Sequence, residues 1–112
     1  NFKVSSLIRT SFRKALKIYT KSGKTKILKE YDIDISLIIE HLRQPPQDGK
    51  KYDIDHIFPI TAFDLNNPDH IRICWHPDNL QWLEKSKNCS KGNKYSEKLF
   101  KIYLSEHLNN IS

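Results

Sequence analysis

The side chains best suited to chemistry lie between Tyr52 and Tyr95, where Asp55 is followed directly by His56. A histidine is the side chain best able to take a proton from water near neutral pH. Asp55 offers an anionic oxygen and Asn88 a neutral one, and such hard oxygen ligands suit Mg²⁺ or Mn²⁺. With two protein ligands, the ion keeps several positions for water and phosphate oxygens. The pattern therefore predicts a phosphodiester-hydrolysing centre with His56 as general base and one metal ion on Asp55 and Asn88.

Supporting roles fall to a few neighbouring side chains. Asn79 follows a turn, where its amide can both donate and accept hydrogen bonds. We group Asn79 with His56 as a catalytic position, with the task of fixing the loop that carries the histidine. Lys91 lies three residues after Asn88 on a predicted helix, so the two share a face and the lysine can bind a neighbouring phosphate. We assign nucleic-acid contacts to Lys91, His76, Arg13 and Lys94.

His76 has three candidate roles. It can contact the scissile phosphate, help to bind the metal, or anchor the turn before Asn79. We favour the structural role slightly over the other two, and all three stay open at this point.

The tripeptide Asp-His-Ile occurs twice, at 55–57 and 69–71, and context separates the two copies. The first lies in an alternating polar and apolar segment, which is typical of a strand whose rigid backbone holds a side chain in place. The second follows Asn67-Pro68, where Asp69 complements the dipole of a helix N-terminus. We therefore assign the chemistry to Asp55 and His56, and helix capping to Asp69.

The composition limits the kinds of partner. The 112 residues fit one compact domain. Nineteen Lys and Arg against thirteen Asp and Glu give a net charge of +6, which favours a polyanion, and nucleic acid is the partner we expect. An ordinary lysine-rich surface explains the charge alone equally well. No apolar run approaches the roughly 20 residues of a membrane span, so we expect no membrane partner and a cytoplasmic protein.

The two cysteines, Cys74 and Cys89, form no Cys-x-x-Cys pair. A structural zinc site needs four soft ligands at short spacings, so none is expected. A single disulfide is compatible with the sequence, but we favour free, partly buried thiols in a reducing compartment.

The elements that must position these residues begin with two amphipathic helices. The first has apolar residues at helical spacing and ends near Ser22-Gly23. Its apolar positions are Val4, Ile8, Phe12, Ala15, Leu16 and Tyr19. The second helix carries the stripe Ile35, Ile38, Ile39 and Leu42, with Asp34 as N-cap and Pro45-Pro46 stopping it soon after. A loop from Gln44 to Lys51 then leads to the central segment.

The central segment changes period at Tyr52 to the alternation of a strand, which ends at Phe58-Pro59. Adjacent strand residues point to opposite faces, so Asp55 and His56 can serve one site only if the strand twists, bulges or ends there. A short helix from Pro68 to about Trp75 follows, with Asn67 as its cap. The later elements are a strand at 79–83, a helix at 84–91 stopped by Gly92, and a closing helix from 96 to about 108.

Taken together, these motifs resemble the HNH nuclease family. Asp55-His56-Ile57, Asn79-Leu80 and Asn88-x-x-Lys91-Gly92 follow the order of the family's three motif positions. More specifically, Ile54 to Pro59, Phe63-Asp64-Leu65 and Trp75-His76-x-x-Asn79-Leu80-Gln81 look like the zinc-free HNH proteins common in phages and other mobile elements. The resemblance covers about 45 residues strongly and the upstream helices only loosely.

This resemblance implies an α+β fold with a ββα-metal core, in which a short two-stranded antiparallel hairpin packs on a helix around one divalent metal. N-terminal and C-terminal helices flank that core. It also implies that His56 activates water, that Asp55 and Asn88 bind the metal, and that Asn79 is structural. Asn88 stands where the family name has a histidine, a variant that keeps metal binding but leaves the preferred metal undecided.

The sequence thus predicts one nuclease domain over 1–112. It comprises a helical part at 1–50, the metal core at 51–95 and a C-terminal helix at 96–112. Because the chain starts at Asn1 and has no methionine, we expect it to be processed or excised from a longer protein. The predicted function is a metal-dependent DNA endonuclease, with double-stranded DNA as the expected partner. The alternatives are the cleavage domain of a larger restriction or homing enzyme, acting as a homodimer or with an added specificity domain, and a catalytically silent nucleic-acid-binding module.

Overall fold

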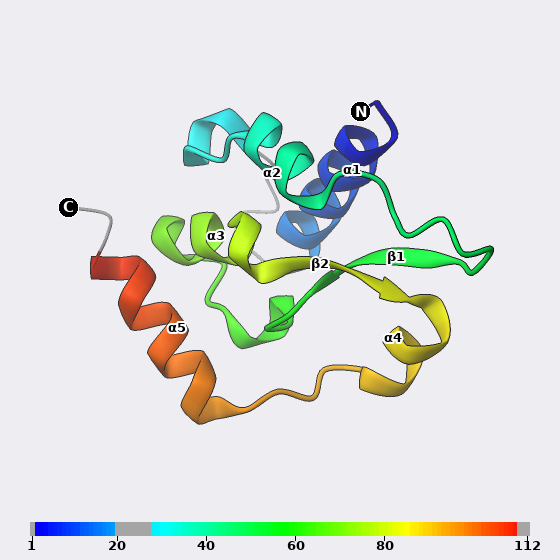
Figure 1. The fold of residues 1–112 in the computed structure, drawn as a ribbon. Helices are drawn as coiled ribbons and strands as arrows, with labels where there is room; N and C mark the ends of the chain where they lie inside the picture. The colour runs from blue at the N-terminus through cyan, green and yellow to red at the C-terminus, as the bar shows by residue number, and fades with distance from the viewer. Residues whose placement is uncertain (1, 20–27, 110–112) are drawn as a thin grey trace.

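The computed structural model describes residues 2–19 and 28–109, which form an α+β fold with one two-stranded sheet (Figure 1). The helices are α1 (Phe2–Tyr19), α2 (Ile35–Leu42), α3 (Pro68–Cys74), α4 (Lys85–Lys91) and α5 (Glu97–Asn109), and the strands are β1 (Tyr52–His56) and β2 (Leu80–Glu84). Three short 3₁₀ turns lie between them: η1 (Leu28–Tyr31), η2 (Ile60–Ala62) and η3 (Pro77–Asn79). The coarse class predicted from the sequence is confirmed.

Local signals in the sequence explain where several helices begin and end. The Asp34 side chain accepts a hydrogen bond of 2.9 Å from the Ser36 amide, which caps α2. The Asn67 side chain caps α3 in the same way, with Pro68 in the first turn. Helix α4 ends at Gly92, whose φ of 54° suits a residue without a Cβ. The predicted end of the first helix, near Ser22-Gly23, lies outside the described residues.

The sheet pairs β1 with β2 in antiparallel fashion, residue for residue from Tyr52 opposite Glu84 to His56 opposite Leu80. A site shared by the adjacent residues Asp55 and His56 requires the strand to twist, bulge or end there. Strand β1 ends at His56, and its one-to-one register with β2 contains no bulge. The predicted start of the second strand was wrong by one residue. Asn79 belongs to η3 and β2 begins at Leu80.

The apolar core lies between α1, α2, α3 and the start of β2. Helix α1 contributes one buried face, as its spacing predicts. That face consists of Val4, Ile8, Phe12, Ala15 and Leu16. Trp75, which follows α3, is fully buried, and its ring meets that of Phe12 edge to face with centroids 5.0 Å apart. The Trp75 ring also meets that of His56, the last residue of β1, so the core holds the end of α3 close to the end of β1.

Helix α5 is attached differently, because none of its residues is fully buried. Its Phe100 ring meets those of Phe58 and Phe63, and the Tyr103 hydroxyl donates a 3.1 Å hydrogen bond to the Ile73 carbonyl. Leu99 and Ile102 remain exposed. The closing helix predicted over 96–108 is present over Glu97–Asn109, but it lies on the surface of the core as a lightly packed element.

Candidate active site

The end of β1 and helix α4 together form one pocket of about 320 Å³. Asp55 and His56 line it from the strand, and Asn88 lines it from α4. Ser11 and Tyr19 of α1 complete another part of the wall. The three residues predicted to supply the metal ligands and the general base are thus brought to one cavity, even though 33 positions separate Asp55 from Asn88 in the chain.

Asp55 is buried, with 7% of its surface exposed, and its carboxylate is fully engaged. The Lys91 ammonium donates to Oδ1 at 3.1 Å and to Oδ2 at 2.9 Å, and it also donates to the His56 carbonyl at 2.6 Å. The Gln81 amide, directly opposite in the sheet, donates to Oδ2 at 2.9 Å. These bonds fix the carboxylate and place a positive charge beside it. Lys91, predicted to contact a phosphate, is bound here by Asp55.

His56 lies between the pocket and the core. Its ring meets the Trp75 ring edge to face, with centroids 5.1 Å apart, and its Nε2 is buried without a hydrogen-bond partner among the described residues. Burial lowers the pKa of His56 to about 4; the Asp55 charge opposes this shift and the Lys91 charge adds to it. His56 is therefore neutral near pH 7, the form of imidazole that can accept a proton.

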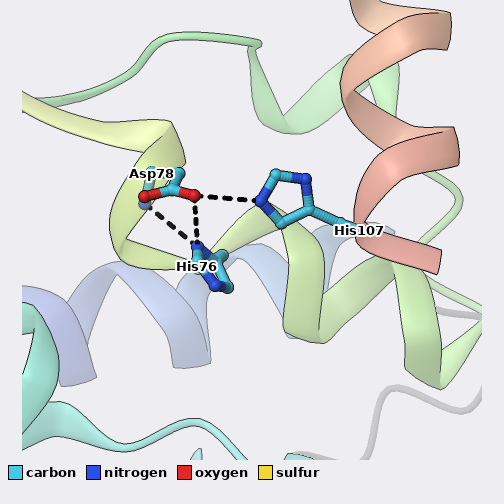
Figure 2. A group of neighbouring side chains, drawn as sticks. All are labelled: His76, Asp78 and His107. Carbon is cyan, nitrogen blue, oxygen red and sulfur yellow. Dashed lines mark hydrogen bonds and ion pairs between the residues drawn. The ribbon is translucent and has the colours of Figure 1, made fainter. Parts of the chain in front are cut away.

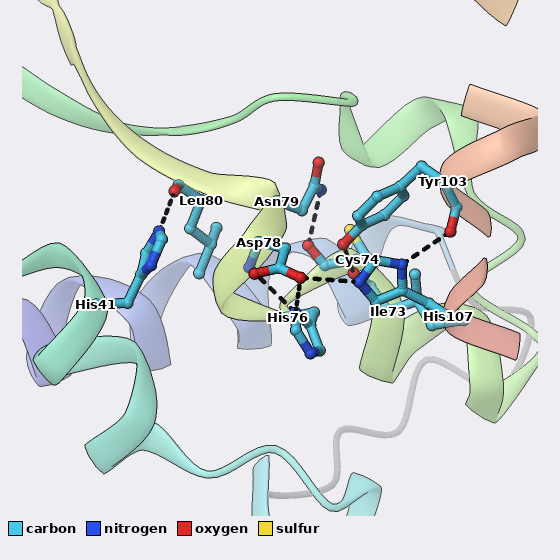
Figure 3. A network of polar contacts seen from close by, with 9 residues as sticks. All are labelled: His41, Ile73, Cys74, His76, Asp78, Asn79, Leu80, Tyr103 and His107. Atoms are coloured by element: carbon cyan, nitrogen blue, oxygen red, sulfur yellow. Dashed lines mark hydrogen bonds and ion pairs between the residues drawn. The ribbon is translucent and has the colours of Figure 1, made fainter. Parts of the chain in front are cut away.

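Asn79 is fully buried and connects the loop after β1 with the end of α3. Its Oδ1 accepts a 2.8 Å hydrogen bond from the Phe58 amide, and its Nδ2 donates to the carbonyls of Phe58, at 3.1 Å, and Cys74, at 2.9 Å. Figure 3 shows the Asn79 side chain turned toward the Cys74 carbonyl. Its backbone carbonyl also accepts from the Ile57 amide at 2.8 Å. This arrangement holds the segment that directly follows His56, as the sequence predicts.

The remaining predicted site residues are more dispersed. Arg13 on α1 and Lys94 after α4 are exposed. The His76 side chain caps η3 by accepting a 3.1 Å hydrogen bond from the Asp78 amide, so it anchors the turn before Asn79. The second Asp-His-Ile copy does not line the pocket of Asp55. In that copy, the Asp69 carboxylate forms an ion pair with Arg72 at 2.9 Å. The His70 ring accepts a hydrogen bond from the Asp64 amide.

Sequence reasoning missed two contributions. Gln81 binds the Asp55 carboxylate, and its position opposite Asp55 follows once the strand register is known. His107 on α5 lies against Asp78 and His76 (Figure 2), which no local pattern could indicate because 29 positions separate it from Asp78. The cysteines are free thiols; Cys74 is buried, which raises the pKa of its thiol, whereas Cys89 is exposed.

Among the helices of residues 2–19 and 28–109, none combines the length and apolar character that crossing a bilayer requires.

Comparison with known proteins finds similarity to a viral protein. The chain is 28% identical over 103 residues to an uncharacterized protein of Acanthamoeba polyphaga mimivirus, in a match that covers 84% of this chain. The chain spans 44% of that relative's length. The sequence matches no protein-family profile. No solved structure matches it either.

Proposed function

We propose that this chain is a metal-dependent DNA endonuclease of HNH type. The observation that carries the proposal is the shared pocket of Asp55, His56 and Asn88, which lies between the end of β1 and helix α4. The order of these elements along the chain is strand, strand, helix, with α3 inserted between the strands. The net charge of +6 supports an anionic substrate.

The pocket fits a divalent metal ion by the chemistry of its donors. Asp55 and Asn88 both offer side-chain oxygens, the ligands that Mg²⁺ and Mn²⁺ prefer. When bound, such an ion stabilises negative charge on a phosphate and its leaving oxygen. A cavity of about 320 Å³ leaves space for phosphate oxygens beside these side chains.

The protein's own groups have separate tasks in this proposal. His56 is neutral near pH 7 and takes the proton from the attacking water. Asn79 holds the backbone at Phe58 and so fixes the loop after His56. Gln81 orients the Asp55 carboxylate. Exposed Arg13 and Lys94 are assigned to the DNA backbone.

The Lys91 contact favours a second candidate, a DNA-binding module without turnover. The ammonium already neutralises Asp55 and bonds both of its oxygens. In the nuclease, Lys91 must release part of this contact when the metal binds, and its charge then becomes available to a phosphate. In the silent module the ion pair persists and Asp55 takes no metal. Metal-dependent cleavage therefore separates the two functions.

The two Asp-His-Ile copies supply a matched test of the nuclease. Supercoiled plasmid is incubated with the wild-type chain, with Asp55→Asn and with Asp69→Asn, in Mg²⁺ or Mn²⁺ and again with chelator. We expect the wild type and Asp69→Asn to nick or linearise the plasmid only with metal, and Asp55→Asn to be inactive. Unchanged cleavage by Asp55→Asn, or cleavage in chelator, would contradict the proposal. Plasmid binding without cleavage by the wild type would favour the silent module.

A further inference from the structure

A second cluster of potential metal-ligating side chains lies outside the pocket of Asp55. It consists of His76 and Asp78 in the η3 turn and His107 on α5 (Figure 2). One possible ligand atom from each residue lies within 4.8 Å of the other two. We call these three residues the His-Asp-His cluster, and nothing in the proposed nuclease reaction uses it.

Hydrogen bonds fix the ring orientation of both histidines. Nδ1 of His107 lies 2.8 Å from the Tyr103 carbonyl, an acceptor, so this nitrogen carries the proton and the Nε2 of the neutral ring carries the lone pair. Nδ1 of His76 accepts the Asp78 amide proton at 3.1 Å, so this nitrogen also carries a lone pair. A carbonyl that holds the distal N–H of a histidine is the usual outer partner of a metal-ligating imidazole.

One carboxylate oxygen lies near a lone-pair nitrogen of each ring. Oδ2 of Asp78 lies 3.1 Å from His107 Nε2 and 3.6 Å from His76 Nδ1. All three atoms are electron-pair donors when the imidazoles are neutral, so their approach requires a shared proton or a cation. Two ligands of one tetrahedral Zn²⁺, with bonds of about 2.0–2.1 Å, lie roughly 3.3 Å apart. The two nitrogen–oxygen distances bracket that separation.

From this geometry we propose that the His-Asp-His cluster binds a borderline transition-metal ion, with Zn²⁺ as the preferred class. Two imidazoles and a carboxylate are ligands that suit Zn²⁺, Co²⁺ and Ni²⁺ better than Mg²⁺. The Asp78 side chain is 61% exposed and His76 borders a pocket of about 850 Å³, so an ion can enter and water can complete its shell. When His76 Nδ1 binds the ion, the exposed Asp78 amide loses its hydrogen bond to this nitrogen and donates to water in its place.

The consequence of metal binding follows from where the ligands sit. Helix α5 has no fully buried residue, and His107 lies near its end. His76 and Asp78 belong to the turn that leads into buried Asn79. A metal ion on the cluster therefore ties the lightly packed C-terminal helix to the turn that supports the proposed nuclease site. The ion would have a structural role, and this role does not depend on whether the chain cleaves DNA.

Cobalt is the most direct probe, because tetrahedral Co²⁺ gives visible absorption bands. Untagged protein carrying Asp55→Asn, which removes the other metal site, is titrated with Co²⁺ and then with Zn²⁺. We expect one equivalent of Co²⁺ to develop the bands and Zn²⁺ to displace it. Asp78→Asn and His107→Gln, made in the same background, should weaken Co²⁺ binding at least about tenfold, since even outer partners of a ligand contribute that much. His70→Gln serves as the matched control and should leave binding unchanged.

A second measurement keeps the test decisive if His107→Gln folds poorly. Asp78→Asn keeps the size of an exposed side chain, so its fold should be preserved, and the thermal midpoint is measured with and without Zn²⁺. Zn²⁺ should raise the midpoint of the Asp55→Asn chain and of His70→Gln, and not that of Asp78→Asn. No cobalt bands with excess Co²⁺, or equal binding by Asp78→Asn, would overturn the proposal and leave a shared proton as the explanation for the cluster.

Discussion

Asn79 joins two backbone segments beside the proposed nuclease pocket. Its amide satisfies three backbone groups in two segments, at Phe58 and Cys74. A structural role for this residue was predicted because an asparagine beside a turn before an apolar segment is suited to bridging backbone groups. It could not predict that Cys74 is one of the partners, since that contact depends on how α3 packs.

We predict that Asn79→Ala destabilises the fold by roughly 2–4 kcal/mol, because it leaves buried backbone donors and acceptors without partners. Urea unfolding of the variant and of the wild type measures this change. Asn109→Ala, at the exposed end of α5, is the control and should shift the free energy of unfolding by less than about 0.5 kcal/mol. Equal stability of Asn79→Ala and the wild type would refute the bridging role.

His56 gives a prediction for stability as a function of pH in the metal-free protein. Burial lowers the folded-state pKa of His56 to about 4, whereas an unfolded histidine titrates near 6.5. Between these values the unfolded chain binds more protons than the folded chain, so stability is lost as the pH falls from about 6.5 to about 4.

His56→Asn should flatten this part of the curve. Burial also lowers the pKa of His76, which adds to the loss of stability at low pH. The difference in the free energy of unfolding between wild type and variant therefore isolates the contribution of His56. Urea unfolding at a series of pH values in chelator provides it. Parallel curves for the two proteins would show that His56 is not held neutral by the fold.

Among the elements, α3 links Asn79 to His56 through the residues at its C-terminal end. Its N-terminus is capped by Asn67, while the residues at its other end hold Asn79 and contact His56. We predict that Asn67→Ala costs about 1 kcal/mol of stability, whereas Asn67→Asp, which keeps a capping oxygen, costs little. Thermal or urea unfolding tests the pair. Similar losses for both variants would indicate that the cap is not what Asn67 contributes.

How much of each element could be predicted depends on how local its cause is. Asp34 caps α2 and Asn67-Pro68 starts α3, and both signals act within two residues of the helix. The start of β2 was misplaced because Asn79 closes a 3₁₀ turn with the His76 carbonyl, and alternating polarity does not separate that turn from a strand. Contacts between distant residues, such as Lys91 with Asp55 and His107 with Asp78, depend on how the elements pack, so they could not be predicted from the sequence.

Over the whole molecule, the net charge of +6 makes electrostatic attraction a main contribution to the proposed DNA binding. If Arg13 and Lys94 each contact a phosphate, Arg13→Gln and Lys94→Gln should each reduce the salt dependence of binding, lowering the slope of log K against log salt by about 0.9. Lys29→Gln, an equal loss of charge on the exposed side of η1, is the matched control. Fluorescence anisotropy with a duplex at several salt concentrations measures the slopes. Equal slopes for all three variants would remove the two residues from the interface.

The variant His56→Ala shows whether Asp55, His56 and Asn88 form a nuclease centre. The variant is compared with His70→Ala, from the look-alike tripeptide, in plasmid cleavage with Mn²⁺ and in duplex binding with chelator. Loss of a general base should reduce the cleavage rate at least about 100-fold while DNA binding is retained, and His70→Ala should cleave like the wild type. Full cleavage by His56→Ala in Mn²⁺ would show that His56 is not the general base of a nuclease centre.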